Sequence, residues 1–374
     1  MEPPPFLCEE LQLEILSWLP VKSLVRFKCV SKSWNSTISD SQFIKLHLHR
    51  SSSTRRNTDF AYIRSLITWP PESPSATTVT IPDEYDFSGT CNGVMCLSTY
   101  LVHERERERE RDDYISRVCL WNPATRSMSQ HSPPLRFTST SCWSFGFGYD
   151  SSTDTYKVVV AVNHSWPWFR EKTMVNVYNM GHTCWRTYQL SHLPSMYPDG
   201  DAVHVSNTLN WVAILPEDGT ELINPDRCII LSFDLGRESC VQLSLPYCTR
   251  DFNHYGPILG VLRGCLCICQ TYKKTRFEIW QMKEFGMHES WTRLFNITGY
   301  ESIIQNIRRW PCFAMYMSEK GDALLLSRSS WNPLHAVLCT QEENKLEVTD
   351  IIANNIVDCY VNNYIESLVS PYEK

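Results

Sequence analysis

A strand signal recurs five times along this 374-residue chain. Each copy is a turn followed by a short apolar run, and the copies begin at Gly93, Thr155, Thr208, Gly264 and Gly321. Their spacings of 62, 53, 56 and 57 residues approach the length of a kelch-type β-propeller blade, which is roughly 50 residues. The repeat therefore predicts an all-β, propeller-like body.

A second strand signal alternates with the first and supports the same period. It is a strand that ends in a polar turn, and it occurs at Trp121, Tyr178, Phe233 and Trp280. Strand-like segments within residues 58–85 and 346–369 could join to form a sixth blade, which would close the ring and hide the sheet edges. The chain contains no Gly-Gly pair of the kelch type. A pair of β-sandwiches whose hairpins only resemble repeats is therefore the alternative.

Residues 7–49 have a helical pattern instead. Leu11, Ile15, Leu16 and Leu19 form a stripe with helical spacing. Shorter helices are expected beyond Pro20, with Ser31 and Asp40 as candidate N-caps. A helical unit of about 45 residues is too small to bury all of its apolar side chains, so it is expected to need a partner.

The expected fold class is thus α+β multidomain, with a small helical domain followed by an all-β, kelch-like propeller of about six blades. The expected boundaries are residues 1–50 for the helical domain, 51–88 for a linker and first strands, and 89–374 for the β domain.

Charge and the terminal sequence limit the kinds of partner. There are 35 Lys and Arg against 41 Asp and Glu, a net charge of −6, so no basic excess favours nucleic acid. The first residues lack a basic region followed by an apolar stretch, and no segment approaches 18 uninterrupted apolar residues. We therefore expect no membrane partner and a location in the cytoplasm or nucleus. For the 16 cysteines we expect reduced thiols that pack as small apolar groups.

No pattern in the chain nominates a catalytic, cofactor or metal site. Phosphate-binding, dinucleotide-binding, nucleophile-elbow and zinc-helix motifs are all missing. Cys265, Cys267 and Cys269 would lie on one face of a strand, where core packing is expected rather than zinc binding. For His47 and His49 we expect a solvated helix end rather than a ligand pair. A copper-dependent kelch-type oxidase would contradict these expectations.

Two further segments have weaker signals. The Glu-Arg alternation from Glu104 to Arg111 is interpreted as a solvated loop between strands, because its charges cancel. Trp166, Trp168 and Phe169 are candidate substrate-binding residues on a loop tip, since adjacent aromatics can anchor a partner. They could equally cover the propeller core.

Residues 7–43 closely resemble the F-box of plant F-box proteins, above all in the run from Ile15 to Trp34. The rest of the chain resembles the F-box-associated interaction domain of the F-box/kelch-repeat family. The segments that carry this resemblance are 89–93, 120–126, 146–150, 156–159, 230–235, 279–286 and the tail 364–371.

The resemblance implies a non-catalytic substrate receptor of an SCF ubiquitin ligase. In that family the F-box binds a Skp-type adaptor, which bridges to cullin and RING subunits, and the C-terminal domain selects the protein to be ubiquitinated. A propeller module that binds a small ligand or glycan through stacked Trp residues is the alternative.

The resemblance also assigns roles within the F-box. The expected adaptor contacts are Leu7, Leu19, Pro20, Val21, Leu24 and Val25. The residues expected in the internal core are Leu11, Ile15, Phe27 and Trp34. Cys8 stands where the family usually has Pro, and a lost proline removes local rigidity. Lower adaptor affinity is therefore expected.

Overall fold

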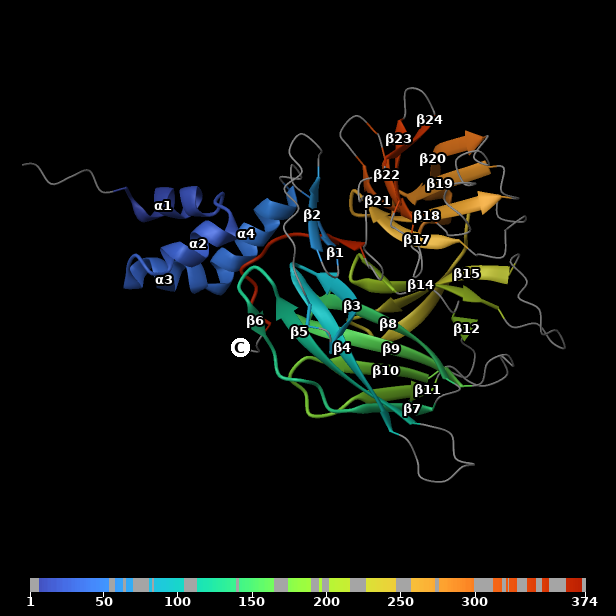
Figure 1. Cartoon of the computed structure of the whole chain (residues 1–374), viewed down its shortest axis with the longest axis horizontal. Coiled ribbons are helices and arrows are strands. Elements are labelled where there is room, and N and C mark those ends of the chain that lie inside the picture. The colour runs from blue at the N-terminus through green and yellow to red at the C-terminus, as the bar shows by residue number, and fades with distance from the viewer. Residues whose placement is uncertain are drawn as a thin grey trace, which may run out of the picture.

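The computed structural model shows a helical unit that projects from a larger β body (Figure 1). The described residues are 7–53, 58–62, 65–69, 81–82, 84–103, 113–138, 141–164, 174–189, 195–196, 202–215, 227–246, 257–272, 276–298, 312–317, 321, 323–327, 335–340, 345–349 and 361–371. Within them, no helix is long and apolar enough to cross a membrane.

Four helices form the N-terminal unit. They are α1 (Glu9–Leu16), α2 (Val21–Phe27), α3 (Lys32–Ser39) and α4 (Ser41–Ser53). Both expected N-caps are confirmed. The Ser31 hydroxyl accepts a hydrogen bond from the Trp34 amide at 3.1 Å, and the Asp40 carboxylate accepts from the amides of Gln42 and Phe43 at 2.9 and 3.1 Å. These bonds satisfy amides that a helix start leaves free.

The described strands form six antiparallel sheets. The first contains β1 (Thr58–Tyr62), β2 (Ser65–Trp69) and β25 (Val361–Tyr364). The second contains β3 (Asp86–Cys91), β4 (Val94–His103), β5 (Asp113–Asn122), β6 (Ser127–Met128) and β7 (Leu135–Thr138). The third contains β8 (Ser141–Asp150), β9 (Thr155–His164), β10 (Met174–Asn179) and β11 (Arg186–Gln189).

The remaining three sheets continue in chain order. The fourth contains β12 (Ser195–Met196), β13 (Val203–Val205), β14 (Thr208–Ile214), β15 (Cys228–Asp234) and β16 (Ser239–Leu243). The fifth contains β17 (Ile258–Leu262), β18 (Cys265–Tyr272), β19 (Arg276–Met282) and β20 (Trp291–Thr298). The sixth contains β21 (Cys312–Met317), β22 (Ala323–Ser327), β23 (His335–Thr340) and β24 (Lys345–Thr349).

The six sheets close into a ring. β3 contacts β8, β8 contacts β13 and β14, these contact β17, β17 contacts β21, and β21 contacts β25, which returns to β3. Asp59 of β1 pairs with Tyr364 of β25, so one sheet combines both ends of the chain. The expected sixth blade is therefore confirmed, and a propeller replaces the β-sandwich alternative.

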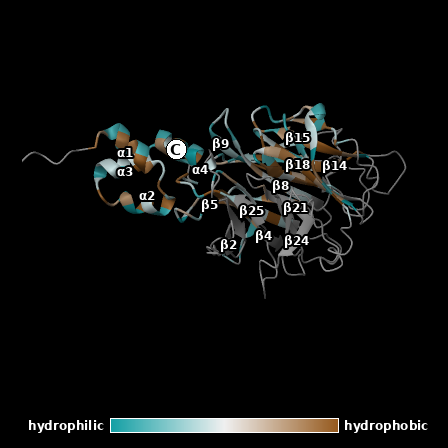
Figure 2. Ribbon diagram, turned by 90° about the horizontal axis from the view of Figure 1, so that it is seen from above, coloured by the Kyte–Doolittle hydropathy of each residue, from teal (hydrophilic) through white to brown (hydrophobic). Residues whose placement is uncertain are grey.

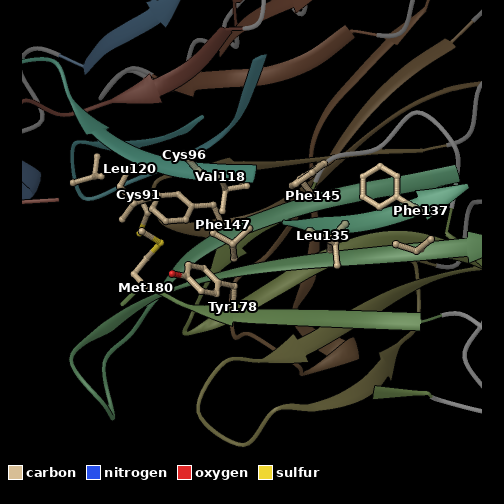
Figure 3. Packing of buried hydrophobic residues seen from close by; sticks show 14 residues of the cluster. Cys91, Cys96, Val118, Leu120, Leu135, Phe137, Phe145, Phe147, Tyr178 and Met180 are labelled. Carbon is tan, nitrogen blue, oxygen red and sulfur yellow. The ribbon is translucent and has the colours of Figure 1, made fainter. Parts of the chain in front are cut away.

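Apolar layers between neighbouring sheets hold the ring together. Figure 3 shows one such layer, in which Cys91, Cys96 and Val118 of the second sheet face Phe145 and Phe147 of the third. Because the side chains of two sheets are packed closely in each layer, the stability of each blade depends on its neighbours. The packing role expected for Cys265, Cys267 and Cys269 is confirmed for the last two, which are buried, whereas Cys265 is only partly buried.

A buried ion-pair network also joins the third and fourth sheets. The Lys157 ammonium lies 3.0 Å from Asp150 Oδ2 and 2.9 Å from Glu238 Oε1. Burial opposes ionisation of Asp150, but hydrogen bonds from Ser152, Thr153 and Lys157 outweigh it and hold the pKa of that carboxyl well below its usual range. The network is fully paired, so it holds two blades in register and leaves no free group for chemistry.

Candidate functional site

Four strongly exposed apolar residues lie on α1 and next to its two ends. Leu7, Leu11, Ile15 and Trp18 are 53%, 52%, 50% and 57% exposed. Leu11 and Ile15 are four positions apart within α1, which places them on the same side of the helix. Leu7 precedes the helix and Trp18 follows it, and we call these four residues the α1 face. Figure 2 shows α1 on the part of the helical unit that lies away from the sheets. An apolar stripe left in water marks a surface that another molecule covers.

The opposite side of α1 packs into a small core. Leu16 is buried there with Val21, Leu24, Ile38 and Phe43. The partly buried side chains Leu19, Val25, Phe27 and Trp34 pack against this cluster. The rings of Phe27 and Trp34 meet edge to face at 5.2 Å, so the core role expected for these two residues is confirmed.

Two sequence expectations are wrong for this unit, because Leu11 and Ile15 were expected in the core and are exposed. Val21 and Leu24, which were expected to contact the adaptor, are buried in the free F-box. The reason is geometric. α1 carries apolar residues on both sides, and helical spacing alone does not tell which side turns inward. Leu7 and Pro20 are exposed, as a contact role requires, and Leu19 and Val25 are only partly accessible.

The last turn of α4 fixes the end of the α1 face. The Arg50 guanidinium donates to Glu14 Oε2 at 2.6 Å and lies 4.9 Å from the centre of the Trp18 ring, a cation–π distance. Trp18 Nε1 donates to Glu14 Oε1 at 3.1 Å. The hydrogen bonds from Arg50 and Trp18 hold the pKa of the Glu14 carboxyl below its usual value. These contacts hold the Trp18 side chain in one orientation, although more than half of its surface is exposed.

Comparison with known families agrees with this arrangement. Residues 6–46 match the F-box domain, and residues 90–371 match the F-box associated β-propeller domain. The chain belongs to the F-box proteins with an F-box associated β-propeller. Its helical unit is the F-box, and its six-sheet ring is the F-box associated domain.

Relatives of similar length support the assignment. An F-box/kelch-repeat protein of Arabidopsis thaliana is 29% identical over 320 residues, which cover 79% of this chain and 80% of the relative. The Arabidopsis F-box protein CPR1 is 26% identical over 326 residues, covering 78% and 72%. Among solved structures, an acylaminoacyl peptidase of Pyrococcus horikoshii aligns with 73% of this chain and 40% of its own at 11% identity. Its TM-score of 0.40 is too low to support an argument about function.

His47 lies inside the F-box, contrary to the solvated helix end expected for it. It is 3% exposed and stacks on Phe43. Its Nε2 donates to the Leu19 carbonyl at 2.9 Å, and its Nδ1 has no hydrogen-bond partner. Burial lowers the pKa of His47 more than the Leu19 hydrogen bond raises it, so the folded F-box favours the neutral imidazole.

The stability of the F-box is therefore expected to fall as the pH drops from 7.5 to 5.5. The unfolded chain binds a proton at His47 more readily than the folded one, because the folded pKa is lowered from about 6.5, and stability then rises with pH. Amide hydrogen exchange of α4 across this range measures the effect. His47→Gln should flatten the dependence, and the exposed His49→Gln serves as the control. An unchanged slope in His47→Gln would refute the assignment.

Two predicted features lie outside the described residues. They are the candidate substrate contacts Trp166, Trp168 and Phe169, and the whole Glu104–Arg111 repeat. Across the part of the chain that is described, no group of three or more His, Cys, Asp or Glu residues could hold a metal ion. The site that the structure does place is thus the α1 face of the F-box.

Proposed function

We propose that this protein is the substrate-recognition subunit of an SCF-type ubiquitin ligase. Its F-box binds a Skp-type adaptor, and through it the cullin and RING subunits, while its propeller binds the protein to be ubiquitinated. The observation that carries the proposal is the α1 face, an uncovered apolar surface on a folded F-box. The protein is a receptor that itself performs no chemical step.

The physical basis is the burial of this face by the adaptor. Each apolar side chain of this size contributes about 1.5–3 kcal/mol when it is fully buried, and here about half of each remains to be covered. Trp18 is the strongest single anchor, because a Trp held rigidly at an interface loses little entropy on binding. The proposed contact set is Leu7, Leu11, Ile15, Trp18 and Pro20, with Leu19 and Val25 at its margin. Val21 and Leu24 support it from inside the F-box.

The role in catalysis is one of placement. A receptor that holds a target lysine next to an activated ubiquitin turns a bimolecular reaction into one within a single complex. Holding two groups in one complex gives effective concentrations of about a millimolar when the geometry lets them meet. No catalytic side chain is then required of this chain, and the apolar F-box surface and the propeller loops suffice.

Co-expression with a Skp-type adaptor tests the proposal. The two purified proteins should elute together as a 1:1 complex, and addition of a cullin–RING pair should give ubiquitin transfer to proteins bound by the propeller. An adaptor that elutes separately from a correctly folded chain would exclude the SCF assignment. Binding of a glycan or hormone by that adaptor-free chain would favour the small-ligand alternative.

Cys8→Pro is expected to strengthen adaptor binding modestly. Cys8 is the N-cap residue of α1, with φ −62° and ψ 157° and no side-chain cap hydrogen bond. Proline prefers φ near −65°, so the substitution is compatible with the backbone. It should stabilise the folded F-box by about 0.4–1 kcal/mol, because it lowers the conformational entropy of the unfolded chain. Isothermal titration with the adaptor measures the change, with Cys8→Ala as the control. Weaker binding by Cys8→Pro would show that the thiol itself makes a contact.

A further inference from the structure

Three sequence motifs with no role in the α1 face meet at one place in the structure. They are Cys91-Asn92-Gly93, Trp121-Asn122-Pro123-Ala124-Thr125 and the tail segment Ser367-Leu368-Val369. Leu368 of the tail and Ala124 of the turn after β5 both belong to or pack against the core cluster of the F-box. The meeting point is therefore the junction of the two domains.

Asn122 holds the tail at this junction. Its side chain is fully buried at the end of β5. Its Nδ2 donates to the Ser367 carbonyl at 2.9 Å and to the Val369 carbonyl at 2.7 Å. Its Oδ1 accepts from the amides of Ala124 and Thr125 at 2.9 and 3.3 Å. One amide group thus fixes both the tail and the turn after β5, and its donors and acceptor are all used.

Gly93 lets the tail pass close to the second sheet. Its φ is +76°, in the left-handed region that favours glycine. A Cβ at this position would collide with the Ile365 carbonyl oxygen and lie 2.5 Å from the Ser367 hydroxyl. The turn after β3 is therefore shaped to the tail, and Ser367 is fully buried against it.

The tail and the turn also complete the core of the F-box. Leu368 is 4% exposed and belongs to the same cluster as Leu16, Leu24 and Phe43, and Ala124 packs against that cluster. A separate ion pair joins α4 to the turn between β8 and β9, with Lys45 Nζ 2.9 Å from Asp154 Oδ2. The F-box core is thus shared with residues more than 70 positions away in the sequence.

We propose that these three motifs form a joint that holds the F-box in one orientation on the propeller. Asn122 and Leu368 are its positioning residues. Asn122 fixes the path of the tail, and Leu368 inserts from the tail into the F-box core. A fixed joint would set the distance between the bound adaptor and the bound target, and thereby the efficiency of ubiquitin transfer. This consequence rests on the proposed function. The joint itself is a property of the chain alone.

Single-molecule energy transfer on the full-length protein tests the joint. Dyes are attached through unnatural amino acids at two exposed positions, Asn35 of the F-box and Glu289 of the turn between β19 and β20. We expect one narrow distance peak for the wild type and for Leu368→Met. Leu368→Ser should lose that single peak and give a broad or split distribution. Val241→Ser is the matched control, since Val241 is an exposed apolar residue outside the joint.

A second variant separates the joint from a general loss of folding. Asn122→Ala releases the tail without changing any F-box residue, and it should broaden the distance peak while adaptor affinity is retained. Thermal melting confirms that the propeller of each variant is folded, and a chain ending after Glu366 replaces Asn122→Ala if that variant does not fold. The proposal is overturned if Leu368→Ser and the tail-release variant (Asn122→Ala or the chain ending after Glu366) both keep a single peak as narrow as that of the wild type. If the wild-type protein binds no adaptor, the SCF role is refuted. The widths of the distance peaks would still show whether the F-box is held in one orientation on the propeller.

Discussion

Ile15→Asp is expected to abolish binding of a Skp-type adaptor while the F-box stays folded. Ile15 lies in the middle of the α1 face with half of its surface exposed, so the free protein accommodates a carboxylate there. In the complex the same carboxylate would be buried against an apolar surface without a partner, which costs about 3 kcal/mol or more. The dissociation constant should therefore rise by about a hundredfold or more, as measured by isothermal titration.

The control for this variant places the same charge elsewhere on the F-box. Asn35→Asp changes an exposed residue of α3 and should leave adaptor affinity close to that of the wild type. Circular dichroism of both variants checks that the helices are retained. Wild-type affinity in Ile15→Asp would mean that the adaptor binds outside the α1 face.

Leu24→Asp is expected to unfold the F-box. Leu24 is completely buried in the F-box core, and an unpaired carboxylate there adds a burial penalty to the loss of packing, which alone costs about 2–5 kcal/mol for a Leu→Ala change. This exceeds the stability expected of so small a core. Adaptor binding is then lost through unfolding of the binding unit, in contrast to the loss of a surface contact in Ile15→Asp.

Hydrogen exchange separates these two mechanisms. In Leu24→Asp the amides of residues 9–53 should exchange freely, while those of the buried strands such as β9 and β15 keep their protection, because their apolar layers do not include Leu24. Retained protection of α2 and α3 together with lost adaptor binding would instead show that Leu24 contacts the adaptor directly.

Much of the architecture could be predicted from the sequence. The turn-and-strand repeat gave the period of the blades, and the strand-like segments near the two ends predicted the seam that β1 and β25 form. These signals are local, since a turn residue and the apolar run after it act over a few positions. Ser31 and Asp40 were predicted as N-caps for the same reason.

The division of the F-box into core and surface could not be predicted. Ile15 and Leu16 are neighbours in the sequence, yet one is exposed and the other buried. What fills the space beside Leu16 includes Leu368, which comes from the other end of the chain. A contact between residues so far apart leaves no trace in the local periodicity. The burial of His47 was missed because its hydrogen-bond acceptor, the Leu19 carbonyl, lies 28 positions away in the sequence.

The most direct test of the central claim is hydrogen exchange of the full-length protein with and without a Skp-type adaptor. We expect added protection in residues 9–18, the segment that carries most of the α1 face, and unchanged exchange in the propeller strands. Adaptor binding that leaves residues 9–18 unchanged and protects another surface would contradict this claim.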